Sequence, residues 1–226
     1  MGEALAKSKI QNKSSALEPV SERIIDVAEQ LFGERGIDGV SLREISSAAG
    51  TSNNYAVQYH FGDLLGLLRA ISKKRMPEVE VLRAQFLMRA KEEGRLDDIR
   101  TLLEILHRPL IEHTNGQGER AYARFILAAL HSPIAQNATA TDLFEAMPIA
   151  THVIDLIASL NKALSPVLLM ERQRLVTLMV LNSVFNRRIP WVGAVADAAL
   201  IDNALDMATA ALLAPVSPSV NKLVKK

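Results

Sequence analysis

Apolar residues recur three and four positions apart along most of the chain, which is the period of a helix with one buried face. The first such run follows Ser21, a favourable N-cap, and stops before Gly36. Its apolar positions are Ile24, Ile25, Ala28, Leu31 and Phe32. No segment shows the apolar–polar alternation of a strand, so the pattern predicts an all-α chain.

Three more helices are predicted before residue 77. Ser41 and Glu44 have the spacing of a capping box at the start of a two-turn helix that ends at Gly50. The polar turn at residues 51–53 supplies a new N-cap for a brief helix that runs to about residue 59. Asp63 caps a fourth helix, which we expect to break at Pro77 because proline disrupts a helix interior.

Beyond Pro77 the helical period continues, interrupted by stretches that carry glycine or proline. The expected helical segments are 78–94, 97–113, 118–131, 142–164, 166–188 and 194–214. The helices before residue 62 are short and those after it are long, which indicates two parts with different tasks.

Composition restricts the function classes. The chain has 226 residues, of which 49% are hydrophobic, enough to bury a sizeable core. Its 26 basic and 25 acidic residues nearly cancel, so a nucleic-acid partner has to be met by a local patch. The absence of cysteine excludes disulfides, zinc–thiolate sites and a cysteine nucleophile. With neither a signal peptide pattern nor a run of about 18 apolar residues, we expect a cytoplasmic protein without membrane contact.

Three short helices with a glycine turn between the second and third match the layout of a helix-turn-helix. The third helix of such a unit buries little and presents polar side chains to a groove of DNA. Its Ala56 and Val57 are suited to face inward. The residues expected to face outward are Asn53, Asn54, Tyr55, Gln58, Tyr59 and His60. Asparagine and glutamine pair with adenine edges, and tyrosine contacts thymine methyl groups or phosphates.

Several pieces of this region match a known family in order and spacing. They are 28–32 (AEQLF), Gly36, 40–45 (VSLREI), 48–50 (AAG) and 59–62 (YHFG). On these residues the segment 21–71 resembles the DNA-binding domain of the TetR (tetracycline repressor) family of regulators. The resemblance implies an all-α fold with an N-terminal three-helix helix-turn-helix domain and a larger C-terminal helical domain for ligand binding and dimerisation.

The resemblance also implies a division of the chain and a function. We expect a mobile tail at 1–17, the helix-turn-helix domain at 18–62, a connecting helix at 63–76, an effector-binding and dimerisation domain at 77–215, and a tail at 216–226. The implied function is that of a transcriptional regulator, a repressor that a small apolar or amphipathic effector releases from a palindromic operator. The alternative is a helical protein-binding adaptor without DNA-binding activity.

Roles carry over from the family by position. Ser41 bonds a phosphate, Arg43 reaches the backbone or a base, residues 53–58 read the major groove, and Tyr59 and His60 anchor to phosphates. Two departures stand out. The chain is one residue longer than the common pattern between Gly50 and Tyr59, which leaves the base-reading register of 53–58 open. In addition, Asp63-Leu64-Leu65 stands where the family often has Ser-Lys-Glu, so a phosphate-binding lysine is missing.

The last two helices have wide apolar surfaces. Segment 166–188 is apolar nearly all round, and the alanine-rich segment 194–214 carries Asp197, Asp202 and Asp206 as its main polar stripe. We therefore expect these segments to form a four-helix bundle with their copies in a homodimer, with a buried monomeric core as the alternative.

Candidates for an effector pocket are large apolar side chains and a histidine, each of which is also suited to an ordinary core position. They are Phe86, Met88, His107, Tyr122, Phe125, Met179 and Phe185.

The remaining alternative function is that of an enzyme. The stretch 116–121 (GQGERA) matches a relaxed dinucleotide fingerprint, but that motif requires a preceding strand, and the segment before it is helical. We expect a loop there, and no catalytic residues, cofactor or metal.

Overall fold

The computed structural model describes residues 19–136, 147–185 and 195–220. The expected tail at 1–17, with its three lysines, lies outside this part of the chain. The helices are α2 (Val20–Arg35), α3 (Leu42–Ala48), α4 (Ala56–Phe61), α5 (Leu64–Glu92), α6 (Ile99–Glu112), α7 (Ala121–His131), α8 (Pro133–Gln136), α10 (Pro148–Leu160), α11 (Pro166–Phe185) and α12 (Asp197–Leu213). No strand occurs among the described residues, so the predicted all-α class is confirmed.

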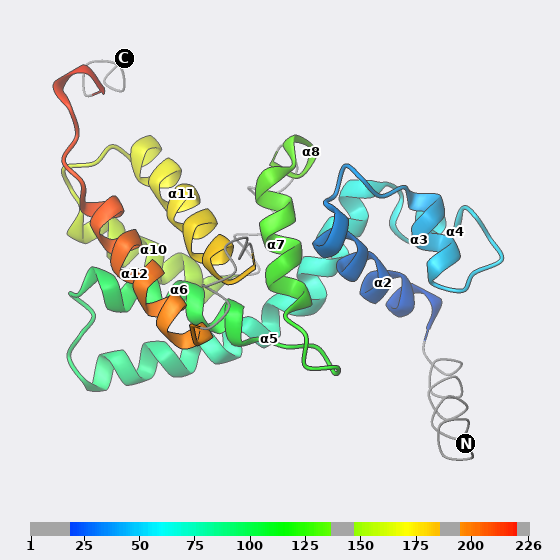
Figure 1. The fold of residues 1–226 in the computed structure, drawn as a ribbon, viewed down its shortest axis with the longest axis horizontal. Coiled ribbons are helices and arrows are strands. Elements are labelled where there is room, and N and C mark those ends of the chain that lie inside the picture. Colours follow the sequence, from blue (N-terminus) through cyan, green and yellow to red (C-terminus); the bar gives the residue numbers. More distant parts are fainter. Residues whose placement is uncertain (1–18, 137–146, 186–194, 221–226) are drawn as a thin grey trace.

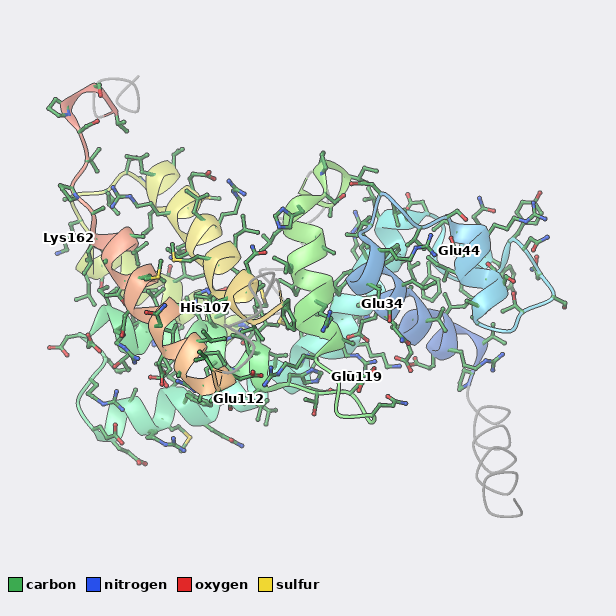
Figure 2. All side chains as sticks on the ribbon, in the orientation of Figure 1. Glu34, Glu44, His107, Glu112, Glu119 and Lys162 are labelled. Carbon is green, nitrogen blue, oxygen red and sulfur yellow. The ribbon has the colours of Figure 1, made fainter. Side chains whose placement is uncertain are left out.

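The molecule is elongated, with the short helices at one end and the long C-terminal ones at the other (Figure 1). Helices α3 and α4 lie at the outer end beside α2, and α10, α11 and α12 gather at the opposite end. Figure 2 shows Glu44 of α3 near the outer end and His107 of α6 among the C-terminal helices. None of the described helices is long and apolar enough to span a membrane.

The predicted break at Pro77 is wrong. Helix α5 runs through Pro77 without interruption, so the expected helices 63–76 and 78–94 are a single helix of 29 residues. A proline in a helix interior costs about 3 kcal/mol. Flanking residues Met76 and Val79 are buried in the core, and one turn later Glu80 accepts from the Ile149 N–H of α10 while Arg83 donates to the Leu106 carbonyl of α6. These tertiary contacts outweigh the local preference for a break.

Other boundaries differ by a few residues. Helix α2 begins at Val20 with Pro19 as its N-cap, so the expected cap Ser21 lies inside the first turn. The short helix α8 occupies part of a stretch expected to be a separator. The stretch 116–121 lies in the loop between α6 and α7, extending to the first residue of α7, as expected from the absence of a strand before it.

Helix α5 joins the two ends of the molecule and is held to α2 by ion pairs. Arg75 of α5 lies 2.8 Å from the buried Glu29 and 2.5 Å from Asp26, and Lys74 bridges Asp26 and Glu22 at 2.7 Å each. Burial raises the pKa of Glu29, while its hydrogen bond to Arg75 opposes the shift. Because Glu29 is buried, loss of the Arg75 charge would leave its carboxylate uncompensated.

Helix α2 also packs directly on α7. A Cβ on Gly33 of α2 would come within 2.9 Å of the Arg124 Cβ of α7, so glycine permits the close approach. Beside this contact the rings of Phe32 and Phe125 lie 6.3 Å apart. The hydrophobic core is therefore continuous from the N-terminal helices into the C-terminal ones. A displacement of α5 or α7 is transmitted to α2 through packed side chains rather than through a flexible linker.

Candidate nucleic-acid interface

The turn between α3 and α4 is fixed by side-chain hydrogen bonds as well as by the two helices. Thr51 Oγ1 lies 3.1 Å from the Ser46 carbonyl oxygen and 2.9 Å from that of Asn53, and its hydroxyl can donate to either. Arg23 of α2 donates from Nε to the Ala49 carbonyl at 3.3 Å. Gly50 has φ +70°, a conformation that favours glycine and turns the chain sharply after α3. The turn thus holds α4 at a set angle to α3.

Helix α3 begins at the predicted cap. The Ser41 Oγ accepts a 3.2 Å hydrogen bond from the Glu44 backbone N–H. The Glu44 carboxylate, which a full capping box would return to the Ser41 backbone, instead pairs with Arg35 at the end of α2. Only half of the capping box is therefore formed, because the ion pair with Arg35 ties α3 to α2.

Helix α4 begins later than the turn pattern predicts. Its first residue is Ala56 and its N-cap is Tyr55, whereas the cap was expected within residues 51–53. The Asn53 Oδ1 accepts a 2.9 Å bond from the Tyr55 backbone N–H and so stabilises a turn before the helix. The helix then extends to Phe61, two residues beyond the expected end. Asn53, Asn54 and Tyr55 accordingly lie in the turn that precedes α4.

The burial pattern of this segment agrees with the pattern expected from the sequence. Ala56 and Val57 are buried, at 3% and 1% exposure. Tyr55 and Tyr59 are 70% and 81% exposed, unusually high values for aromatic side chains. The remaining outward candidates, all of them exposed, are Asn53, Asn54, Gln58 and His60. Ala56 and Val57, together with the partly buried Phe61, thus pack α4 on the core, while Gln58, Tyr59 and His60 face away from the protein.

Ser41 and Arg43 lie at the edge of the same surface. Together with Ser47 and Asn54 they line a shallow hollow between α3 and the turn that precedes α4. Arg43 is exposed and has no ion pair within the described part of the chain, unlike Arg35, which Glu44 neutralises. We call the exposed set Ser41, Arg43, Asn53, Asn54, Tyr55, Gln58, Tyr59 and His60 the polar face.

Helix α5 starts directly behind the polar face. Asp63 caps it as predicted, since its Oδ1 accepts a 2.7 Å bond from the Gly66 backbone N–H. The carboxylate therefore has a local partner, although it remains exposed. Only Gly62 separates α4 from this cap, so any movement of the first turn of α5 moves α4 as well.

The candidates for an effector pocket are only partly brought together, since the rings of Tyr122 and Phe125 stack with their centres 5.9 Å apart. A largely apolar cavity of about 240 Å³ lies between α5, α6, α7 and α8, and of the seven candidates only Phe125 is among its lining residues. Met88 is 62% exposed on α5, and Phe185 stacks under Arg124 with the guanidinium carbon 4.9 Å from the ring centre. The candidates drawn from the sequence did not include Leu68, Ser72 and Met76, which line this cavity from the inward face of α5.

His107 has a structural environment. It is buried between α6 and α11, with Nδ1 2.8 Å from the Leu103 carbonyl and Nε2 3.0 Å from Thr177 Oγ1. Burial lowers its pKa to about 4, so the ring is neutral at pH 7. The remaining candidates are Tyr122, which is fully buried, and Phe86 and Met179, which are partly buried.

Comparison with known proteins gives a match for the same segment. The family model of bacterial regulatory proteins, tetR family, matches residues 24–71. The HTH-type transcriptional repressor BepR from Brucella suis biovar 1 (strain 1330) is 36% identical over 73 residues, which are 32% of this chain and 34% of BepR. The aligned part thus spans about a third of the length of that relative.

Two solved structures are similar over most of the chain. One is the TetR family transcriptional regulator PfmR from Thermus thermophilus, at TM-score 0.45 and 15% identity, covering 86% of this chain and 96% of PfmR. The other is a protein from Mesorhizobium loti MAFF303099 assigned to the TetR family, at TM-score 0.43 and 19% identity, covering 86% of this chain and 95% of that chain. Residues 24–71, with their helix-turn-helix geometry, thus match the N-terminal domain of the tetR family of bacterial regulatory proteins.

Proposed function

We propose that this chain is a DNA-binding transcriptional repressor that binds a palindromic operator as a homodimer and is released by a small-molecule effector. The observation that carries the proposal is the exposed polar face on and before α4, a short helix of which only Ala56 and Val57 are fully buried. An exposed helix with outward amide and phenol groups fits the major groove, where these groups pair with base edges and phosphates.

Within this proposal the residues divide by task. Gln58 and the asparagines at 53 and 54 read base edges, since paired amide contacts are suited to adenine. Ser41, Tyr59 and His60 contact phosphates, and Arg43 reaches the backbone or a base. Asn53 enters with its amide N–H₂ free to donate, because its oxygen is bonded to the Tyr55 backbone.

The first experiment measures DNA binding by fluorescence anisotropy, with DNA from upstream of the protein's own operon. We expect binding that weakens as salt rises. The double variant Gln58→Ala/Tyr59→Ala is expected to weaken it by about tenfold or more, since each good base contact contributes about 1–3 kcal/mol. Gln85→Ala, which changes an exposed glutamine on α5, is the matched control and should bind like the parent.

A parent protein that binds none of its own upstream DNA would contradict the proposal and favour the protein-binding adaptor. If the double variant bound DNA as tightly as the Gln85→Ala control, the polar face would have no role in DNA binding, even though the parent binds.

The proposed dimer forms through α11 and α12, a part of the expected segments 166–188 and 194–214. The three aspartates of α12 are directed at arginines of the same protomer: Arg100 lies 2.6 Å from Asp206, Arg108 lies 2.5 Å from Asp202, and Arg120 lies 2.6 Å from Asp197. The polar stripe of α12 therefore packs toward α6 and the start of α7. Apolar side chains are left on the outside, among them Met207 and Leu213 of α12 and Val167, Met170 and Leu175 of α11.

An outward apolar surface on two adjacent helices supports association with a second copy. We expect sedimentation velocity to give a dimer at micromolar concentration. Met207→Glu places a charge on this surface and should shift the equilibrium toward monomer. The same substitution at an exposed methionine of α5, Met88→Glu, should leave the dimer intact. A parent protein that sediments only as a monomer would refute the dimer.

The effector site within this proposal is the cavity behind α5. Leu68, Ser72 and Met76 line it from α5, whose first turn directly follows α4. A ligand there touches the helix that sets the position of the polar face. The ligand can shift the equilibrium between the DNA-binding and the released conformation only by the difference between its binding free energies for the two.

A further inference from the structure

The loop that joins α6 to α7, marked by Glu119 in Figure 2, contains a chemically reactive pair of residues. Among the asparagines of the whole chain, Asn115 alone is followed by glycine. Because glycine has no Cβ, its backbone nitrogen can be approached more closely than that of any other residue. The side-chain amide of an asparagine can react with the nitrogen that follows it, since the two close a small ring, a succinimide.

The nitrogen of Gly116 is accessible. Gly116 is exposed, and a Cβ on it would meet no atom within 4 Å among the described residues. Its backbone N–H has no hydrogen-bond acceptor in the part of the chain that the structure describes. The nitrogen is therefore neither shielded by packing nor engaged in a bond that has to break before it reacts.

The side chain of Asn115 is held over the same loop. Its Oδ1 accepts hydrogen bonds from the backbone N–H of Gln117 at 3.0 Å and of Glu119 at 2.8 Å. Two donors stabilise the negative charge that develops on this oxygen when a nucleophile attacks Cγ. The bond from Gln117 also closes a ring of atoms that includes both Cγ and the Gly116 nitrogen, so the reacting atoms stay near each other.

We propose that Asn115 is a site of spontaneous deamidation and isomerisation, and that the product loosens the loop between α6 and α7. Solvent base removes the proton of the Gly116 N–H, the nitrogen attacks Cγ, and Nδ2 takes up a proton and leaves as ammonia. Water then opens the resulting succinimide. Attack of water at Cγ gives aspartate, and attack at the main-chain carbonyl carbon of residue 115 gives isoaspartate. The overall reaction consumes one water and releases one ammonia.

Either product disturbs the contacts that hold the loop. The Asn115 Nδ2 donates a 3.1 Å bond to Glu119 Oε2, and a carboxylate oxygen in its place would repel that carboxylate. Isoaspartate also adds a methylene to the main chain. It therefore misaligns the two backbone bonds that close the loop, from Asn115 to the Glu119 carbonyl and from Gly118 to the Asn115 carbonyl, each 2.9 Å long. The inference is independent of the proposed function.

Peptide mass spectrometry of the full chain, incubated at physiological temperature and mildly alkaline pH, tests the proposal. We expect the peptide that contains Asn115 to gain the mass that exchange of an amide NH₂ for OH brings, and an isoaspartyl methyltransferase to methylate part of it. Asn54 is the comparison within the same molecule, because it is exposed but followed by the bulky Tyr55. Asn115 should convert severalfold faster than Asn54, and faster still as the pH rises.

Variants of the loop separate the ring closure from general exposure. Gly116→Ala retains the fold but hinders the approach of the nitrogen to Cγ, so we expect severalfold slower conversion. Gln117→Ala is the matched control, since it changes an exposed side chain of the same loop and keeps the backbone N–H that bonds to Oδ1. This control should convert at the parental rate.

The effect of the product on the loop is measured by thermal denaturation. Asn115→Asp should melt below the parent, because its carboxylate faces that of Glu119. Asn115→Asp/Glu119→Gln removes the repulsion and should regain part of the loss. Equal melting temperatures of Asn115→Asp and the parent would overturn the proposed loosening of the loop.

The time course of the parent protein decides the chemical step even if a variant fails to fold. If Asn115 kept its mass over weeks, or converted no faster than Asn54, the proposed site would be wrong. Equal rates of conversion in folded Gly116→Ala and in the parent would also overturn it.

Discussion

Replacing Gly66 by alanine is expected to displace α4 and to weaken DNA binding by about tenfold or more, through lost base contacts at both half-sites. A Cβ at Gly66 would overlap the carbonyl oxygen of Phe61, the last residue of α4. The obstacle is backbone, so no side-chain rotation relieves it. The first turn of α5 and the end of α4 must move apart, and the polar face moves with them.

The same substitution is expected to destabilise the fold. Alanine gains about 1 kcal/mol over glycine in a helix. Overpacking against backbone costs about 1–3 kcal/mol or more, so the net change in the free energy of unfolding is unfavourable. Thermal denaturation measures the stability, and anisotropy measures DNA affinity.

Gly116→Ala is the matched control for Gly66→Ala. Gly116 lies in the loop before α7, and a Cβ there meets no atom within 4 Å in the described part of the chain. We expect parental stability and DNA affinity from it. If Gly66→Ala behaved like Gly116→Ala in both measurements, the close approach of α4 and α5 would have no role in setting the polar face.

Acidification is expected to destabilise the protein through His107. The pKa of this buried ring is about 4 in the folded chain, against about 6.5 for an unperturbed histidine. Because the folded pKa is the lower one, the contribution is fully present above pH 6.5 and is lost as the pH falls toward 4. The loss amounts to about 2 kcal/mol by pH 5, at about 1.36 kcal/mol per unit.

His107→Gln isolates this contribution, because glutamine retains hydrogen-bonding groups and does not titrate. Urea denaturation of both proteins at pH 7.5 and pH 5 gives the free energies of unfolding. We expect the parent to lose about 2 kcal/mol more than the variant over this interval. Equal losses in the two proteins would show that His107 does not titrate abnormally.

The features of the polar face that the sequence predicted correctly all depend on neighbouring residues. The Ser41 and Asp63 caps formed because a side-chain oxygen reaches a backbone N–H three residues ahead, whatever the rest of the chain does. The inward direction of Ala56 and Val57 followed from their apolar character beside polar neighbours. Such short-range effects can be predicted from a single sequence.

The errors arose where distant segments meet. Pro77 was expected to end a helix, yet the packing of Met76 and Val79 carries α5 through it. The aspartates of α12 were expected as a polar stripe, but the sequence did not show that this stripe faces three arginines nearly 80 to more than 100 residues away. No local pattern encodes which partner will neutralise a charge.

The sequence by itself determined the helical class, the order of the N-terminal helices and which residues of α4 are buried or exposed, because helical periodicity, caps and glycine turns act within a few residues. Only the tertiary structure decided that α5 is continuous, that α12 buries Ile201, Leu205 and Leu212 but leaves Met207 and Leu213 exposed, and that an apolar cavity lies behind α5. These features depend on the sum of long-range packing and charge pairing, which exceeds the small energetic preferences of any local segment.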